Sequence, residues 1–296
     1  MVDVSKIIID DVIGNSEYVA EAFCSEISSN QLIKICTGDS LYILKVYSKN
    51  VFYEKERDFM YLFRKNKCKV PRLVRYSSSG SQLWILYEYI EGISLSQFKH
   101  QLTLDDMKHI WKQVGRELRK IHSISILNEA ETEKNKSVFL HKIERTVEIF
   151  NNYLDKREPV LLLVNAIHFL KNNISRIIKS NYGIVLYDIN DKHFIIKQTK
   201  GKWRLNAFVD FEQTRFGCLF IDIACLYINA LFENKELDKS FRAGYDPEQL
   251  NFDDNCICFF SIYFGIELCT VLRKDDVCNY QRGIFIIENT LKLINL

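Results

Sequence analysis

The chain has 296 residues, 47% of them hydrophobic, and its 40 basic and 38 acidic side chains leave a formal net charge of +2. A balance this close lacks the positive surplus by which proteins attract nucleic acid or an anionic membrane. We therefore expect neither as a partner. The length allows a large buried core divided over two lobes.

The targeting and cysteine patterns indicate an intracellular protein. The first fifteen residues contain acids and no long apolar stretch before a small-residue cleavage site, so we predict no signal peptide. The segment 256–272 is apolar but is interrupted by Glu267 and is short for a membrane span, which favours a buried helix. Nine scattered cysteines, mostly in apolar runs, indicate buried free thiols in a reducing cytosol. We expect a cytoplasmic monomer.

The first ninety residues predict strands and one helix. Apolar, β-branched runs over 27–36 and 40–47 flank the turn Thr37-Gly38-Asp39 and predict a hairpin. The other elements expected here are a helix over 51–65, a return to extended chain from Val70-Pro71 and a strand over 83–90.

Beyond Gly92 the pattern is mainly helical. Apolar residues from Met107 to Ile121 recur at helical spacing, and Thr103 precedes them as an N-cap. Runs over 194–197 and 203–211 predict one embedded hairpin. The other expected helices cover 137–154, 159–179, 219–233 and 254–273.

This order of elements predicts an α+β fold with two lobes. The smaller, strand-rich lobe covers residues 1–90, with a hinge near 87–92. The larger and mainly helical lobe covers 91–296.

The embedded hairpin gathers polar residues. Antiparallel pairing places His193, which enters the first strand, beside Asp210, which leaves the second, and Asp188 lies five positions before His193. Aspartate and histidine can hold a divalent cation, and a spare carboxylate can orient an attacking hydroxyl. The alternative is structural, with Asp188 and Asp191 as turn formers and Asp210 as a loop cap.

Lys45 and Glu56 form a second candidate pair. Alternation in the strand 40–47 places Lys45 on the face of Ile43 and Tyr47, where a charge needs a partner or an anionic ligand. Glu56 falls inside the apolar stripe of the following helix. A lysine held against phosphates by a glutamate is a kinase arrangement. An edge lysine that reaches water and a chance placement of Glu56 remain the alternatives.

The ordered set of segments resembles the aminoglycoside phosphotransferase and choline kinase superfamily, the small-molecule relatives of protein kinases. The resemblance covers about residues 40 to 245 and implies a bilobal protein-kinase-like fold. Each segment alone is weakly specific, whereas the set in this order is strong. The segments are YILKVY, EKERDFMYLF, VPRLV, WILYEYIEGISL, VGRELRKIHSI, VLYDINDKHFII, VDFEQTRFGCLFIDIA and FRAGY.

The resemblance implies a role for each residue of the later segments. Asp188 would accept or orient the proton of the substrate hydroxyl. Asp210 would hold Mg²⁺ on the phosphates, with His193 as the second metal ligand. Asp222 would brace the catalytic loop, which is the segment VLYDINDKHFII over residues 185–196.

On the nucleotide side, the resemblance implies that Lys45 contacts the phosphates and that Glu56 steadies it. Backbone groups at Glu88 and Ile90 would bind the base of ATP or GTP. Tyr87 would line the back of the base pocket, where its bulk favours guanine; a core tyrosine is the alternative.

Three positions depart from the family pattern. Leu186 stands in place of the usual histidine, and His193 in place of the commonest asparagine, although imidazole is a softer ligand than an amide oxygen. The phosphate-covering loop is poor in glycine, and Ser29 and Asn30, with Ser28 before them, are its candidates.

We therefore predict an O-phosphotransferase that moves the γ-phosphate of ATP or GTP to a small hydroxylated molecule. Acidic residues such as Glu212 and Asp246 suit an aminoglycoside-like acceptor, although they can equally be a solvated face. A choline, sugar or amino-alcohol kinase is the close alternative. A pseudokinase, which binds nucleotide without turnover, is the alternative of another class.

Overall fold

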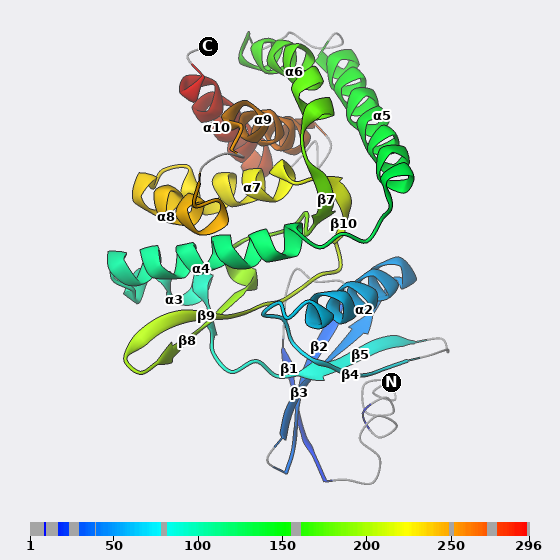
Figure 1. Ribbon diagram of the computed structural model, residues 1–296, viewed down its shortest axis with the longest axis vertical. Coiled ribbons are helices and arrows are strands. Elements are labelled where there is room, and N and C mark those ends of the chain that lie inside the picture. Colours follow the sequence, from blue (N-terminus) through cyan, green and yellow to red (C-terminus); the bar gives the residue numbers. More distant parts are fainter. Residues whose placement is uncertain are drawn as a thin grey trace.

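The computed structural model is α+β, with a strand-rich lobe and a larger helical lobe stacked along the long axis of the molecule (Figure 1). The fold class therefore agrees with the prediction, whereas the division at residue 90 stays a prediction. The residues that the structure describes are 9, 17–23, 30–38, 40–77, 82–154, 161–248, 252–270 and 277–294.

The first lobe is a five-stranded antiparallel sheet in the order β1-β2-β3-β5-β4. The predicted hairpin is β2 and β3, which pair from Thr37 and Ser40 onward. Helix α2 (Asn50–Lys65) packs on the sheet through Tyr53, and Met60 and Phe63 on its buried stripe join the core of the second lobe. The strands are β1 (Val19–Phe23), β2 (Gln31–Thr37), β3 (Ser40–Tyr47), β4 (Leu73–Tyr76) and β5 (Leu83–Glu88). The sequence did not predict β1, and β5 ends two residues earlier than expected.

The chain leaves the sheet through Glu91 and Gly92 and enters β6 (Ile93–Ser94). Gly92 has a φ of +145°, and a Cβ atom there would lie 2.4 Å from the Ile196 carbonyl oxygen. Only glycine allows this crossing. The amide of Asn206 donates to the Glu91 carbonyl (2.7 Å), so the connection is fixed to the embedded hairpin of the second lobe.

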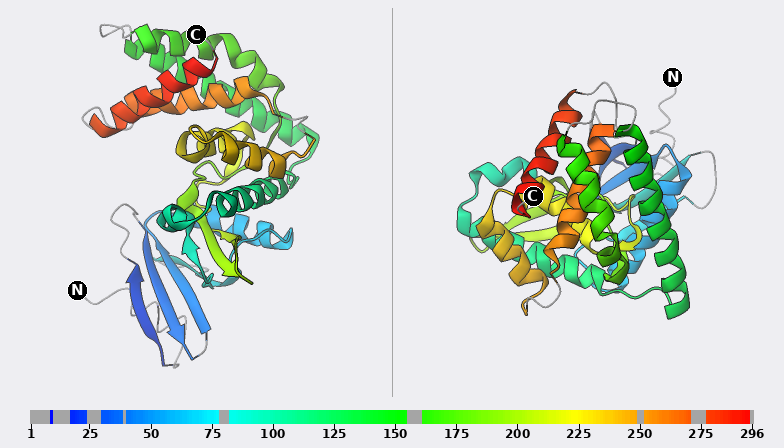
Figure 2. Two further views of the ribbon diagram at one scale, coloured as in Figure 1. Left: turned by 90° about the vertical axis from the view of Figure 1, so that its left-hand side faces the viewer. Right: turned by 90° about the horizontal axis from the view of Figure 1, so that it is seen from above.

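The second lobe holds the embedded hairpin, a two-stranded sheet and most of the helices (Figure 2). The predicted helix over 104–121 is α4, and the Thr103 hydroxyl caps it by accepting from the Asp106 amide. Helix α5 starts at Glu129, eight residues before the predicted start, because the Asn128 side chain caps it there. Helix α10 was not predicted.

The bounds of the elements of the second lobe are α3 (Leu95–Phe98), η1 (Lys99–Gln101), α4 (Leu104–His122), α5 (Glu129–Leu154), α6 (Leu161–Lys179), β7 (Tyr182–Val185), η2 (Asp191–His193), β8 (Phe194–Thr199), β9 (Lys202–Phe208), β10 (Arg215–Cys218), α7 (Phe220–Leu226), the π-helical turn η3 (Tyr227–Leu231), α8 (Lys235–Tyr245), α9 (Asp254–Thr270) and α10 (Val277–Leu293).

Helices α4 and α8 cross at unusually close range. A Cβ atom at Gly244 would lie 2.0 Å from the Lys112 carbonyl oxygen, and one at Gly115 would lie 2.3 Å from the Phe241 carbonyl oxygen. The two glycines therefore let the backbones touch. This contact brings His122, at the C-terminal end of α4, beside Tyr245, at the C-terminal end of α8.

Helix α9, the apolar segment of the sequence, is a core helix, as predicted. Ile257, Phe259, Phe260 and Ile262 are each at most 2% exposed. The cysteines expected in the core are buried as well: Cys225, Cys256, Cys258 and Cys269. Within the described ranges, no helix has both the length and the apolar character that a membrane span requires.

Candidate active site

Lys45 is the centre of the site. It lies on β3, between β2 and β5, and is 4% exposed. Its ammonium group contacts three carboxylates: Glu56 Oε2 at 2.7 Å, Asp210 Oδ1 at 2.9 Å and Glu212 Oε2 at 3.0 Å. A lysine has three N–H donors, so all three can be satisfied. Burial disfavours the charge of Lys45, but the three carboxylates raise its pKa well above the ordinary value.

Glu56 receives three donors in the interior of the molecule. Besides Lys45, the Tyr47 hydroxyl donates to Oε2 (2.6 Å) and the Phe211 amide donates to Oε1 (3.3 Å). Burial raises the pKa of the Glu56 carboxyl, and Lys45 opposes that shift. Because Phe211 belongs to the second lobe, this one carboxylate fixes α2 to the segment that carries Asp210.

Asp210 and His193 face each other at the base of the embedded hairpin. The Val209 amide donates to the His193 carbonyl (3.0 Å), so the strand partner of His193 is Val209, one residue before the predicted Asp210. Asp210 has a φ of +68°, a backbone conformation that is costly for a residue other than glycine and that is concentrated at functional sites. Burial disfavours its charge, but Lys45 and His193 lower the pKa of Asp210 below the ordinary value.

The imidazole of His193 is oriented by the catalytic loop. Its Nδ1 lies 2.8 Å from the carbonyl oxygen of Asp188, which can only accept, so Nδ1 carries the proton. Nε2 therefore presents a lone pair, 3.7 Å from Asp210 Oδ2. The Asp188 side chain is exposed and accepts from the Asn190 amide at 3.3 Å.

These groups fit a divalent cation. Metal-binding histidines almost always donate their other ring nitrogen to a carbonyl or carboxylate, as Nδ1 of His193 does. The Asp210 Oδ2 atom is left for the same cation, because Oδ1 contacts Lys45. Oxygen atoms of Glu56, Asp210 and Glu212 also lie within 4.8 Å of one another. We call Lys45, Glu56, Asp188, His193, Asp210 and Glu212 the transfer cluster.

Asp222 lies under the catalytic loop and is fully buried. Its two oxygens accept from the backbone amides of Leu186 and Tyr187, each at 2.7 Å, and His122 Nε2 lies 3.0 Å from Oδ2. The other ring nitrogen of His122 contacts the Tyr245 hydroxyl at 2.7 Å. The Leu186 side chain thus lies in the apolar core, at the position where the family has histidine. Its backbone amide connects the loop to Asp222.

Sequence reasoning did not assign His122 and Tyr245 to the site. Both were visible as parts of quoted segments, since His122 ends VGRELRKIH and Tyr245 ends FRAGY. Only the close crossing of α4 and α8 brings them together, and sequence pattern carries no signal for that contact.

The residues expected to bind the base lie at the C-terminal end of the inner strand β5, where the chain leaves the sheet for the second lobe. Tyr87 pairs with Ile43 on β3, and burial, together with Glu56, raises its pKa. The Glu88 amide donates to the Arg72 carbonyl and the Tyr89 amide to Leu41, both at 3.0 Å. These two bonds fix the strand that leads to Ile90.

The remaining predicted residues are placed differently from one another. Asn30 is 5% exposed; its amide nitrogen donates to Glu212 Oε2 (2.6 Å) and its oxygen accepts from the Ser48 amide (3.1 Å). Ser29 lies outside the described residues. Glu212 belongs to the transfer cluster, whereas Asp246 is 4% exposed at the end of α8. The two acids expected at the acceptor are thus not brought together.

Comparison with known proteins defines the family. The family model described as the phosphotransferase enzyme family matches residues 24–254. The chain belongs to this family, and it is a phosphotransferase with the bilobal fold of small-molecule kinases. No curated protein matches it in sequence.

Solved structures show the same fold over the whole chain. A spectinomycin phosphotransferase in complex with ADP and spectinomycin has a TM-score of 0.64 at 13% identity, covering 99% of this chain and 98% of that one. An ADP-bound aminoglycoside phosphotransferase has a TM-score of 0.63 at 16% identity, covering 97% and 98%. The ethanolamine kinase of Plasmodium vivax has a TM-score of 0.65 at 14% identity, covering 97% and 87%.

Proposed function

We propose that the chain transfers the γ-phosphate of a nucleoside triphosphate to a hydroxyl of a small molecule, with the transfer cluster as the reacting site. The observation that carries this proposal is the contact of Lys45 with both Glu56 and Asp210, two residues that are 11 and 165 positions away. A lysine–glutamate pair and a metal-binding aspartate are the parts by which kinases position a triphosphate.

In the proposed reaction, Asp188 acts as the base. Its exposed carboxylate orients the acceptor hydroxyl and takes its proton, while the hydroxyl oxygen attacks the γ-phosphorus. The bond from the γ-phosphorus to the bridging oxygen breaks, and the nucleoside diphosphate leaves with that electron pair. Positioning and charge neutralisation supply most of the rate enhancement in such reactions.

A divalent cation, with Mg²⁺ as the first candidate, would be held by Asp210 and His193. When bound, it neutralises charge on the phosphates. Because imidazole is a softer ligand than carboxylate or amide oxygen, we expect Mn²⁺ to support the reaction at least as well as Mg²⁺.

The donor base would lie between the strand end at Glu88 and Ile90 and the ring of Tyr87. A bulky aromatic residue at that place favours guanine over adenine. Parallel titrations with ATP and GTP test this part, and a clear preference for ATP would contradict it without touching the transfer cluster.

The family and its structural neighbours leave the acceptor open, because the solved structures act on different compounds at 13–16% identity. An aminoglycoside is the acceptor that the sequence first suggested, through Glu212 and Asp246. Glu212 already contacts Lys45 and Asn30, and Asp246 is buried, so neither supports that choice here. A pseudokinase is disfavoured by the complete transfer cluster.

The experiment that tests the proposal is ³¹P NMR of the reaction mixture, with ATP or GTP and a panel of aminoglycosides, macrolides, amino alcohols, sugars and aromatic alcohols. A new phosphate-ester resonance that depends on the wild-type enzyme supports the proposal. Nucleotide-dependent thermal stabilisation with no product from any class would instead favour the pseudokinase.

A further inference from the structure

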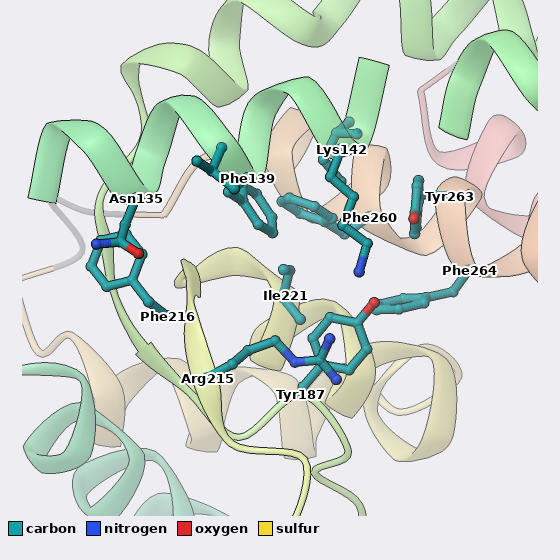
Figure 3. Close-up of a pocket in the computed structure, with 12 residues that line it drawn as sticks. Asn135, Phe139, Lys142, Tyr187, Arg215, Phe216, Ile221, Phe260, Tyr263 and Phe264 are labelled. Carbon is teal, nitrogen blue, oxygen red and sulfur yellow. The ribbon is translucent and has the colours of Figure 1, made fainter. Parts of the chain in front are cut away.

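A cavity of about 180 Å³ lies beside the catalytic loop, between α5, α9 and β10 (Figure 3). One of its walls is Tyr187, the residue directly before Asp188. The apolar lining is mainly aromatic: Phe139, Phe216, Phe260, Tyr263 and Phe264. A cavity of about 150 Å³ holds one benzene molecule. This cavity therefore has room for one flat ring and not for a chain of linked sugars.

The charged residues that line the cavity are two cations, Lys142 and Arg215. The Arg215 guanidinium stacks 3.7 Å from the centre of the Tyr187 ring and donates to the backbone and side-chain oxygens of Gln213, both at 3.0 Å. These bonds use two of its five N–H donors. Figure 3 shows the amino group of Lys142 pointing from α5 toward Tyr187 and Arg215.

A third cation comes from the other lobe. Lys55 precedes Glu56 on α2 and is half-buried, and burial together with the charges of Arg215 and Lys142 lowers its pKa. Among the described residues, none of these three cations has a carboxylate within ion-pairing distance. Three like charges with no carboxylate in direct contact favour the binding of an anion.

One carboxylate faces this group from α9. Glu267 lies near Lys142 and Arg215, but burial raises its pKa while the two cations and the Tyr263 hydroxyl oppose the shift. One carboxylate thus stands against the three cations Lys55, Lys142 and Arg215. The electrostatic balance at the cavity therefore stays positive.

We infer that the acceptor is an anionic hydroxylated molecule built on one aromatic or similarly flat ring. This inference rests on the proposed function, because it takes Asp188 as the base. The ring would fill the aromatic cavity and the anionic group would meet Lys142 and Arg215. The hydroxyl would then extend past Tyr187 to Asp188, its neighbour in the chain. A polycationic acceptor would be repelled by the same residues.

Three small probes that share a benzyl alcohol core and differ in the charge of the para substituent test this inference. They are 4-(hydroxymethyl)benzoate, benzyl alcohol and 4-(hydroxymethyl)benzylamine, titrated by ligand-observed NMR into the protein with ADP. We expect the benzoate to bind at least about tenfold more tightly than the amine, which is the worth of one charge-assisted hydrogen bond. Equal affinities, tighter binding of the amine or no binding of the benzoate would overturn the inference.

Paired variants locate the binding. Lys142→Met together with Arg215→Met should reduce the affinity for the benzoate to that for benzyl alcohol, while the affinity for benzyl alcohol and for ADP stays unchanged. Lys134→Met, on an exposed position of α5, is the matched control and should change none of these values. Unchanged benzoate binding in the double variant, with ADP binding intact, would show that the anion binds elsewhere.

The transfer assay separates the two proposals. Transfer to the benzoate faster than to the other probes supports both. Transfer to the amine in preference to the benzoate would keep the phosphotransferase and overturn the anionic acceptor. Charge-dependent binding that the double variant abolishes, with no transfer to any hydroxyl compound, would support the anion-binding cavity and contradict the phosphotransferase.

Discussion

The transfer cluster and the aromatic cavity, which are linked in the chain by Tyr187 and Asp188, treat charge in opposite ways. In the cluster, Lys45 contacts three carboxylates and Glu56 receives three donors, so the charges are matched within the protein. At the cavity, Lys142 and Arg215 line a mainly aromatic wall, Arg215 donates to neutral oxygens of Gln213, and Glu267 is one carboxylate near the two cations. The matched charges of the cluster indicate which reaction the site performs. The surplus of positive charge at the cavity indicates that the ligand there is negatively charged.

The difference also shows how each region is held in place. Asp222, His122 and Tyr245 form a buried hydrogen-bonded chain beneath the catalytic loop. The cavity is held by aromatic packing, for instance by Tyr187 against Phe264. Hydrogen bonds demand specific partners, so substitutions in the cluster should cost more than substitutions around the cavity.

Replacing the proposed base should separate catalysis from binding. Asp188→Asn keeps the size of the side chain but removes the proton acceptor, so we expect kcat to fall by about 10² to 10⁴. Dissociation constants for ADP and for the benzoate probe should stay within about twofold, because the one hydrogen bond of this carboxylate among the described residues is that from Asn190. Steady-state turnover on an accepted substrate and titration calorimetry check the two halves. Wild-type turnover in this variant would remove Asp188 from the mechanism.

Removing the central cation should destabilise the cluster itself. Lys45→Met leaves Glu56 buried without its ion-pair partner, which costs about 3–5 kcal/mol for pairs of this kind. Adding Glu56→Gln should recover part of that loss, because the unpaired charge is gone. Urea unfolding followed by circular dichroism measures both. A double variant no more stable than Lys45→Met would mean that the carboxylate charge is not the source of the cost.

Substitutions of Asp222 and Tyr245, which support the catalytic loop from below, should have an intermediate effect on the free energy of unfolding. Asp222→Asn replaces one accepting oxygen by a donor that faces a backbone amide, so we expect a loss of about 1–3 kcal/mol in the free energy of unfolding. Tyr245→Phe removes only the far end of the chain and should cost about 1 kcal/mol. Equal losses for the two variants would contradict the assigned order of support.

Local pattern was sufficient for much of the fold. Period-two alternation located β3 and placed Lys45 inward, and helical spacing placed Glu56 on the inner stripe of α2. The register of the embedded hairpin brought His193 to Asp210. These are short-range relations, since strand and helix periods fix which face a side chain occupies.

Long-range packing was not accessible in the same way. The partners of Asp222 depend on α4 crossing α8 at Gly115 and Gly244, which no local period encodes. The cavity cations come from α2, α5 and β10, so their convergence follows from tertiary structure alone. The burial of Asp246 at the end of α8 was likewise not predictable from the acidic character of this region.

The smallest expected effect concerns Glu267 and the pH dependence of the cavity. Burial raises the pKa of this carboxyl, so it takes up a proton at a higher pH than an ordinary carboxyl does. As the pH falls through that raised value, the cavity loses a negative charge. We then expect an anion to bind about two- to fivefold more tightly. The probe is 4-(hydroxymethyl)benzenesulfonate, because its charge does not change in this range.

The variant Glu267→Gln is neutral at every pH and should bind the sulfonate with the tighter affinity throughout. The same linkage predicts that the stability of the wild type, like its affinity for the sulfonate, falls as the pH rises. The contribution of a carboxyl with a raised pKa is present below its unfolded pKa and is lost as the pH rises through the folded one. The wild type should thus lose stability relative to Glu267→Gln across this window. A sulfonate affinity that is flat with pH in the wild type would show that Glu267 does not act on the cavity, and the positive balance there would then belong to Lys55, Lys142 and Arg215 alone.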